Sequence, residues 1–178
     1  MSWLKRKWKR LLVRILREKA PPAFIARGWA IGVFYGFTIP FGCQLVLSIP
    51  TALIMKGSKI GAVVGTFVTN HFTIFLIYPV QCWLGNRLMG GELSYGHIVS
   101  ALKEVVAEHS WNSVLELGSG LLEAFFVGGF ALAAVGVPLT YFGILKFVMF
   151  HRARKEARQK RRLARRREKE SRLWEKTK

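Results

Sequence analysis

Two long uncharged segments of this sequence each carry polar residues near the middle, where chemistry could be done. These residues are Thr38 and Gln44 within 28–55, and Asn70, His71 and Thr73 within 60–86. Polar side chains in such apolar segments are costly unless they are paired or functional. Hydroxyl, amide and imidazole groups donate hydrogen bonds to anions, and an imidazole also titrates near neutral pH. The five residues therefore predict a site for an anionic headgroup, or a proton relay at His71. The alternative is interhelical hydrogen bonding of Asn70 or His71 to Gln44.

The first polar group surrounds a predicted helix break at Pro40 and Gly42. Proline has no backbone N–H and glycine permits a turn, so one helix is expected to stop here and another to start near Gly42. Backbone groups freed inside a bilayer must face protein or a wet cavity. The first amides of the second half-helix would favour an anion there, as in transporters with broken helices. A structural kink satisfied by Thr38 and neighbouring helices is the alternative.

Small residues recur in the two segments at an offset of 29 residues. The pairs are Gly28 with Gly57, Gly32 with Gly61, Gly36 with Gly65, and Pro50 with Pro79. Glycines four residues apart lie on one helix face and let backbones approach closely. We therefore predict a tandem repeat whose glycines are helix-packing ridges. Exposed ridges of this kind would also permit a homo-oligomer.

The elements that must position these residues are predicted to be membrane helices. The chain has 178 residues, is 51% hydrophobic, contains no Asp and carries a net charge of +18. A bilayer core of about 30 Å needs about 20 helical residues, and three uncharged stretches, 28–55, 60–86 and 124–145, exceed this length. The fold class predicted is an all-α integral membrane protein with one domain, which excludes an ordinary soluble domain.

Three regions are predicted along the chain. They are a basic amphipathic interfacial helix at 1–20, a membrane domain at 21–150 and a basic, helical cytoplasmic tail at 151–178. The membrane domain is divided into a broken or re-entrant segment at 28–55, a broken transmembrane segment at 60–89, an amphipathic interfacial connection at 92–118 and a transmembrane segment at 121–150.

The charges at the two ends predict the topology. Residues 1–27 hold nine Lys or Arg against one Glu, and residues 146–178 hold fifteen against four. The positive-inside rule then places both termini in the cytoplasm, which requires an even number of crossings. We favour 28–55 as a re-entrant hairpin. The alternatives are two hairpins, or an inverted pair with the last stretch folding back at Gly136 and Pro138.

The remaining composition argues against enzyme chemistry. The apolar segments contain neither Asp nor Glu, and there is no nucleophile constellation or phosphate loop, so we predict no catalytic residue, no cofactor and no metal. Cys43 and Cys82 each lie in an apolar stretch and are expected to be small core residues. The basic ends are expected to bind anionic headgroups of membrane lipids rather than nucleic acid.

Several short motifs resemble one bacterial membrane family. They are Ala26-Arg-Gly-Trp-Ala-Ile-Gly-Val-Phe-Tyr-Gly, Pro40-Phe-Gly-Cys-Gln44, Gly65-Thr-Phe-Val-Thr-Asn70, Tyr78-Pro79 and Leu84-Gly85. Over about 22–89 the chain resembles the family called domain of unknown function twenty sixty-two. The family pattern has Pro after the Asn, where this chain has His71. The resemblance implies a small inner-membrane protein, which in some relatives is joined to a glycosyltransferase domain that this chain lacks.

Two functions are consistent with these observations. The first is binding or translocation of an anionic, lipid-linked substrate, such as a polyprenyl phosphate, at the mid-membrane breaks. The second is a membrane-anchored adaptor or scaffold that uses its basic ends to recruit anionic lipid or an envelope-biosynthesis enzyme. Partnership with enzymes of envelope glycan or lipid-linked sugar metabolism is implied by the resemblance alone.

Overall fold

The computed structural model describes residues 20–100 and 119–176, and within these ranges the chain is helical with no strand. The helices are α2 (Pro22–Thr38), α3 (Gln44–Ile54), α4 (Lys59–Thr66), α5 (Ile74–Leu88) and α8 (Ser119–Lys176). Residues 95–100 are also helical. The all-α prediction is therefore confirmed. The predicted interfacial helix at 1–20 and most of the connection at 92–118 lie outside the described residues.

Helices α2 and α3 form a hairpin around Pro40 and Gly42. Gly42 has a φ of +106°, a conformation that glycine adopts without a Cβ penalty. The hairpin brings the chain back beside the first turn of α2, where the Ser58 N–H donates to the Phe24 carbonyl oxygen at 3.0 Å. Arg27 Nη1 also donates to the Met55 carbonyl oxygen at 3.2 Å, which ties the first part of α2 to the end of α3.

Helix α4 runs beside α2, and the two glycine ridges face each other. A Cβ on Gly32 would overlap the Ala62 carbonyl oxygen and would lie 2.7 Å from the Gly65 Cα. A Cβ on Gly61 would lie 3.0 Å from the Trp29 backbone nitrogen. The glycines are therefore used for close packing within one chain. Because they are buried, they do not support the exposed ridges on which a homo-oligomer was predicted.

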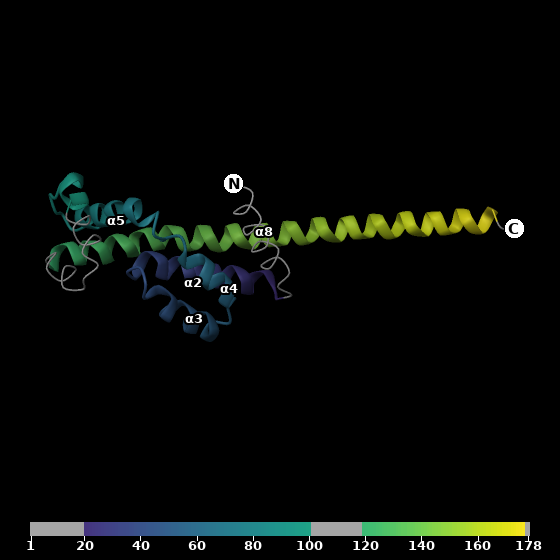
Figure 1. Cartoon of the computed structure of the whole chain (residues 1–178), viewed down its shortest axis with the longest axis horizontal. Coiled ribbons are helices and arrows are strands. Elements are labelled where there is room, and N and C mark those ends of the chain that lie inside the picture. Colours follow the sequence, from purple (N-terminus) through teal and green to yellow (C-terminus); the bar gives the residue numbers. More distant parts are fainter. Residues whose placement is uncertain (1–19, 101–118, 177–178) are drawn as a thin grey trace.

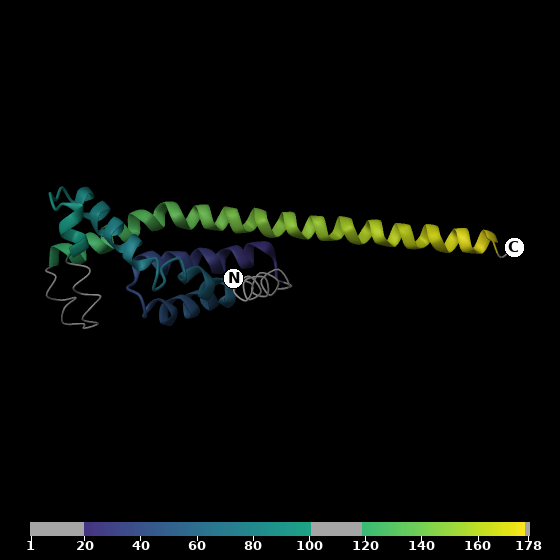
Figure 2. The ribbon, with the colours of Figure 1, turned by 45° about the horizontal axis from the view of Figure 1, so that its top comes forward.

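Helix α8 packs against both α2 and α5, in the antiparallel direction (Figures 1 and 2). Gly129 of α8 lies against the Phe37 carbonyl at the end of α2, and Val148 packs with Ile25 near its start. Along α5, the backbone of Gly128 approaches that of Gln81 in the same close manner. Helices α4 and α5 do not pack along each other. The segment 60–86 is therefore not a second hairpin, and that alternative is wrong.

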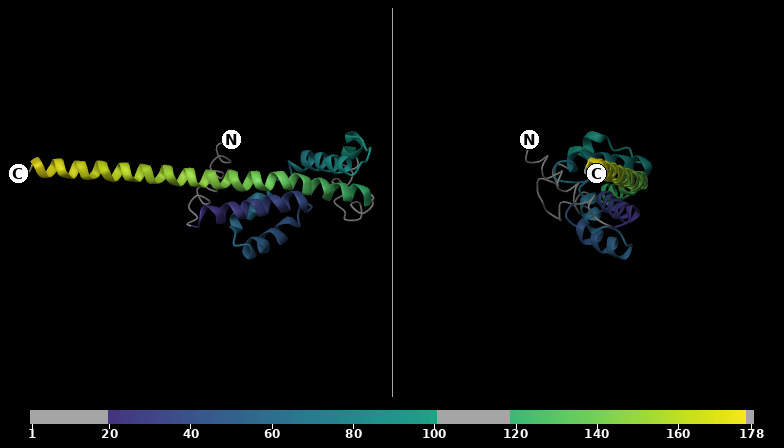
Figure 3. Two further views of the ribbon diagram at one scale, coloured as in Figure 1. Left: turned by 180° about the vertical axis from the view of Figure 1, so that it is seen from behind. Right: turned by 90° about the vertical axis from the view of Figure 1, so that its right-hand side faces the viewer.

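Helix α8 is one continuous helix from Ser119 to Lys176, with Pro138 inside it. The alternative in which the chain folds back at Gly136 and Pro138 is therefore wrong. The predicted division between a membrane segment and a tail at residue 150 corresponds to no break in the helix. Helix α8 is also the one described helix that is long and apolar enough by itself to cross a membrane. Its C-terminal part projects far beyond the other helices (Figure 3).

Candidate functional site

The breaks between α2 and α3 and between α4 and α5 lie together, and α5 supplies partners for the first break. The Phe41 N–H, which cannot continue α2 past Pro40, donates to the Tyr78 hydroxyl oxygen at 2.7 Å. Gln81 Nε2 donates to the carbonyl oxygens of Phe37 and Phe125, each at 2.8 Å. Backbone groups that the break removes from the helix ladder are thereby satisfied by side chains, as a buried break requires.

Gln44 joins the two breaks. Its side chain is 3% exposed, and Nε2 donates to Thr69 Oγ1 at 2.7 Å and to the Ile39 carbonyl oxygen at 3.2 Å. Thr69 Oγ1 in turn donates to the Gly36 carbonyl oxygen at 2.8 Å. This chain of hydrogen bonds links the end of α2, the start of α3 and the loop after α4. The predicted hydrogen bond from Gln44 to Asn70 or His71 is not formed, because Gln44 donates to Thr69 instead.

Asn70 and Thr73 shape the second break locally. Asn70 Oδ1 accepts hydrogen bonds from the N–H groups of Phe72 and Thr73, at 2.9 and 3.1 Å. Thr73 Oγ1 accepts from the Asn70 N–H at 2.8 Å and donates to the Val68 carbonyl oxygen at 2.9 Å. The two side chains cap each other's backbone, in the manner of a helix N-terminus. Their polar groups are consequently engaged within the loop.

The two remaining predicted residues behave differently from each other. Thr38 is buried, and its Oγ1 donates to the Phe34 carbonyl oxygen one turn earlier at 2.9 Å, so it serves its own helix. His71 is exposed, with ring contacts of 6.4 Å to Phe72 and to Phe75. It makes no hydrogen bond to any described residue. Of the five predicted residues, His71 is therefore the one whose polar atoms stay available to a ligand.

Sequence reasoning did not identify the polar residues of α5. Gln81 is fully buried, and its Oε1 has no hydrogen-bond partner in the described part of the protein. The available signal was helical spacing: Tyr78, Gln81 and Gly85 follow at i, i+3 and i+7 and so share one face. The start of α3 also has no capping side chain, so no side-chain oxygen accepts a hydrogen bond from its first backbone N–H groups.

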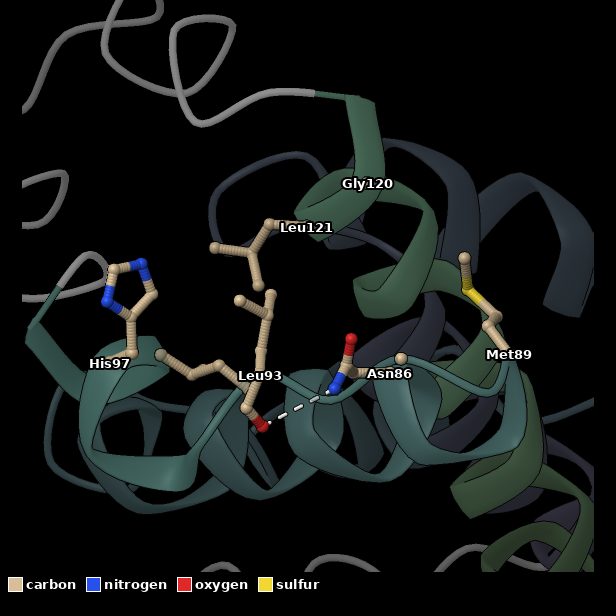
Figure 4. A pocket seen from close by; sticks show the side chains of 8 residues that line it. Asn86, Met89, Leu93, His97, Gly120 and Leu121 are labelled. Atoms are coloured by element: carbon tan, nitrogen blue, oxygen red, sulfur yellow. Dashed lines mark hydrogen bonds between the residues drawn. The ribbon is translucent and has the colours of Figure 1, made fainter.

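A hollow of about 400 Å³ lies away from the breaks, at the other end of α5 (Figure 4). It is lined by Asn86, Met89, Gly91, Leu93, His97, Ile98, Gly120 and Leu121. Asn86 Nδ2 donates to the Leu93 carbonyl oxygen at 3.4 Å, which holds the chain across the floor of this hollow. Residues 20–100 and 119–176 contain no group of three or more side chains arranged to hold a metal ion.

Comparison with known proteins gives a family and nothing narrower. A family model described as "Uncharacterized protein conserved in bacteria (DUF2062)" matches residues 5–157. No curated protein and no solved structure matches the chain.

Proposed function

Because the chain belongs to this uncharacterised bacterial family, we propose its function from its own geometry. We propose a multi-pass protein of the bacterial inner membrane that binds an anionic, lipid-linked headgroup where the two helix breaks meet. A polyprenyl phosphate has the required chemistry. Passage of the lipid between leaflets would follow if the half-helices separate.

The distribution of side chains supports placement in a bilayer. Large apolar side chains point outward, with Val46 at 71%, Phe72 at 89% and Leu139 at 73% exposure, while Gln44 and Gln81 are buried. A soluble protein rarely exposes apolar patches on this scale, because water then orders around them. In lipid the same arrangement costs nothing, and the side-chain N–H groups of Gln44 and Gln81 donate to acceptors inside the protein.

The charged residues support the position of the two membrane surfaces. Those on one side are Arg27, Lys56, Lys59 and Lys146, and those on the other are Arg87, Glu92 and Glu123. Between Glu123 and Lys146, helix α8 has 22 uncharged residues. At 1.5 Å per residue this is about 33 Å, close to a hydrocarbon core of about 30 Å. The side rich in Lys and Arg is then cytoplasmic.

This placement makes the α2–α3 pair a re-entrant hairpin. Helix α2 has 17 residues, about 25 Å, and is therefore shorter than the core. Its end at Phe37 lies against Gly129, six residues along α8 from Glu123, which is about 9 Å. The breaks then lie about 9 Å inside the periplasmic boundary, while α4 with α5 crosses outward and α8 returns. Both termini are cytoplasmic.

One observation carries the headgroup proposal: His71 is exposed at a depth where the surrounding exposed residues are apolar. An imidazole facing hydrocarbon is unfavourable unless a ligand pairs with it, and a lipid phosphate entering from the periplasmic leaflet would supply that partner. The uncapped first turn of α3 lies at the neighbouring first break, which the Gln44–Thr69 hydrogen bond joins to the second, and its helix dipole favours an anion.

The competing function is a membrane-anchored adaptor that recruits an enzyme of envelope synthesis. It is favoured by the engagement of Gln44, Asn70 and Thr73 in hydrogen bonds that hold the fold. If these residues serve only the fold, the breaks shape a hairpin and the charged ends carry the function.

Photo-crosslinking separates the two functions. The protein in nanodiscs is exposed to a diazirine-bearing polyprenyl phosphate or to the matching neutral alcohol. We expect the wild type to label with the phosphate, and His71→Leu to lower that labelling about tenfold, since a hydrogen bond to a charged group contributes about 1.5–3 kcal/mol. His97→Leu, which alters another exposed histidine away from the breaks, is the matched control and should label normally. Equal labelling by phosphate and alcohol, or an unaffected His71→Leu, would refute headgroup binding.

A further inference from the structure

The part of α8 beyond the membrane boundary is a charged rod. Its described side chains between residues 152 and 165 include eight Lys or Arg against one Glu. The eight are Arg152, Arg154, Lys155, Arg158, Lys160, Arg161, Arg162 and Arg165. The first two have local partners, because Arg152 donates to the Ala20 carbonyl oxygen at 2.7 Å and Arg154 lies 4.1 Å from the Phe150 ring centroid. The other six make no ion pair with any described residue.

Distance separates most of this charge from the lipid. The helix is continuous, so the direction of the tail is set by the membrane-spanning part of α8. Arg158 is 12 residues beyond Lys146, and Arg165 is 19 residues beyond it, which is about 18 and 28 Å of helix. The Debye length at physiological ionic strength is about 8 Å. Headgroup attraction can therefore account for the first turn or two of the tail and not for the cations further out.

The arrangement of the cations is unfavourable for an isolated helix. Arg154 with Arg158, Arg158 with Arg162, and Arg161 with Arg165 are like-charged pairs at i and i+4, each destabilising by about 0.2–0.5 kcal/mol. The side chains also surround the helix instead of forming one stripe, because consecutive residues step by about 100°. Counter-charge on more than one side would therefore stabilise this helix.

We propose that the exposed cations from Lys155 to Arg165 bind the phosphate backbone of RNA. Six of the eight cations from Arg152 to Arg165 are Arg, whose planar guanidinium matches phosphate in two-point contacts. An acidic protein would present charge to one face of the helix. The deep, narrow groove of A-form RNA brings two phosphate strands close together and so concentrates negative potential at its mouth, and a helix lying across that groove would meet both strands. The proposal rests on the membrane placement of α8 and not on headgroup binding at His71.

The test uses the full chain in nanodiscs of neutral, zwitterionic lipid and a fluorescent RNA duplex of about 16 base pairs. Binding is followed by anisotropy between about 50 and 200 mM salt, where six phosphate contacts predict an affinity loss of about 10³-fold. The variant carrying Arg158→Gln, Arg161→Gln, Arg162→Gln and Arg165→Gln retains two contacts and should lose only about tenfold.

Two controls make the result specific. Lys56→Gln with Lys59→Gln removes charge at the membrane boundary and should leave RNA binding unchanged. His71→Leu should also bind RNA normally, so that failure of headgroup binding and failure of RNA binding are seen separately. An unaltered salt dependence in the Arg variant would overturn the proposal. So would equal affinity for duplex DNA, equal competition by polyglutamate, or loss of RNA binding when the nanodisc lipid is anionic.

Discussion

The close contact between α5 and α8 makes Gly128→Ala the sharpest test of the helix arrangement. A Cβ on Gly128 would overlap the Gln81 carbonyl oxygen and would lie 3.0 Å from the Gly85 backbone nitrogen. Both neighbours are backbone atoms, which cannot move aside as the end of a flexible side chain can. The two helices would have to separate, and the Gln81 hydrogen bonds across the first break would lengthen.

The magnitude follows from comparison with a second glycine of α8. Gly143 is exposed, and a Cβ there meets nothing within 4 Å. Gly143→Ala should therefore show the helix-propensity gain alone, up to about 1 kcal/mol. Gly128→Ala receives the same gain and adds overpacking, which costs about 1–3 kcal/mol. Because the clash is with backbone, we expect a difference near the upper end, about 3 kcal/mol, or about 150-fold in the ratio of folded to unfolded protein.

Thermal unfolding in one detergent, followed by size-exclusion chromatography after heating, ranks the wild type and the two variants. Steric trapping then gives the free energy of unfolding for each. Gly143→Ala should be as stable as the wild type or more stable, and Gly128→Ala should be clearly less stable. Equal stability of the two variants would refute the packing of α5 on α8 described above.

Three further predictions concern single residues. Gln81→Leu should lower the free energy of unfolding by about 1–3 kcal/mol, measured by steric trapping, because the carbonyl oxygens of Phe37 and Phe125 lose a donor, the second in a buried contact; unchanged stability would contradict this. Lys56 has a φ of +51° at the end of α3, so Lys56→Gly should raise stability by up to about 1 kcal/mol in the same assay, and a loss would show that the lysine side chain stabilises the turn. In a cysteine-free background, a thiol at Lys56 or Ala164 should react only from the cytoplasmic side and one at Tyr95 only from the periplasmic side; a periplasmic signal at Lys56 would exclude the re-entrant hairpin.

Features governed by local rules were predictable from the sequence. Pro40 removes a backbone donor and Gly42 accepts a positive φ, so the interruption between Thr38 and Gln44 follows from those two residues. Glycines at every fourth position indicate close helix packing in the same direct way. Such patterns do not specify which helix a glycine ridge packs against. In this chain the ridges of α2 and α4 pack against each other.

The partners of the buried polar groups were not predictable, because they depend on rotation and register between helices. Gln44 could reach several polar residues of the second segment, and the sequence offers no reason to prefer Thr69 to Asn70. The structure selects Thr69 because the Asn70 side chain is already engaged in capping the backbone of its own loop. The role of Gln81 was not predictable for a similar reason. Its partners are backbone carbonyl oxygens, which every residue has, so no residue type in the sequence identifies them.

The continuity of α8 shows that the end of the apolar segment and the end of the helix are at different positions, which hydropathy alone does not distinguish. Charge begins at Lys146 and becomes dense after His151, which suggests a boundary between a membrane segment and a tail. Helix formation follows different rules, because Arg, Lys, Glu and Ala are all good helix formers and no Pro or Gly follows Gly143. The hydropathy boundary is therefore not a helix boundary. In the proposed membrane placement, the spanning part of α8 sets the direction of the charged rod, so a change of topology would also move the cations from one side of the membrane to the other.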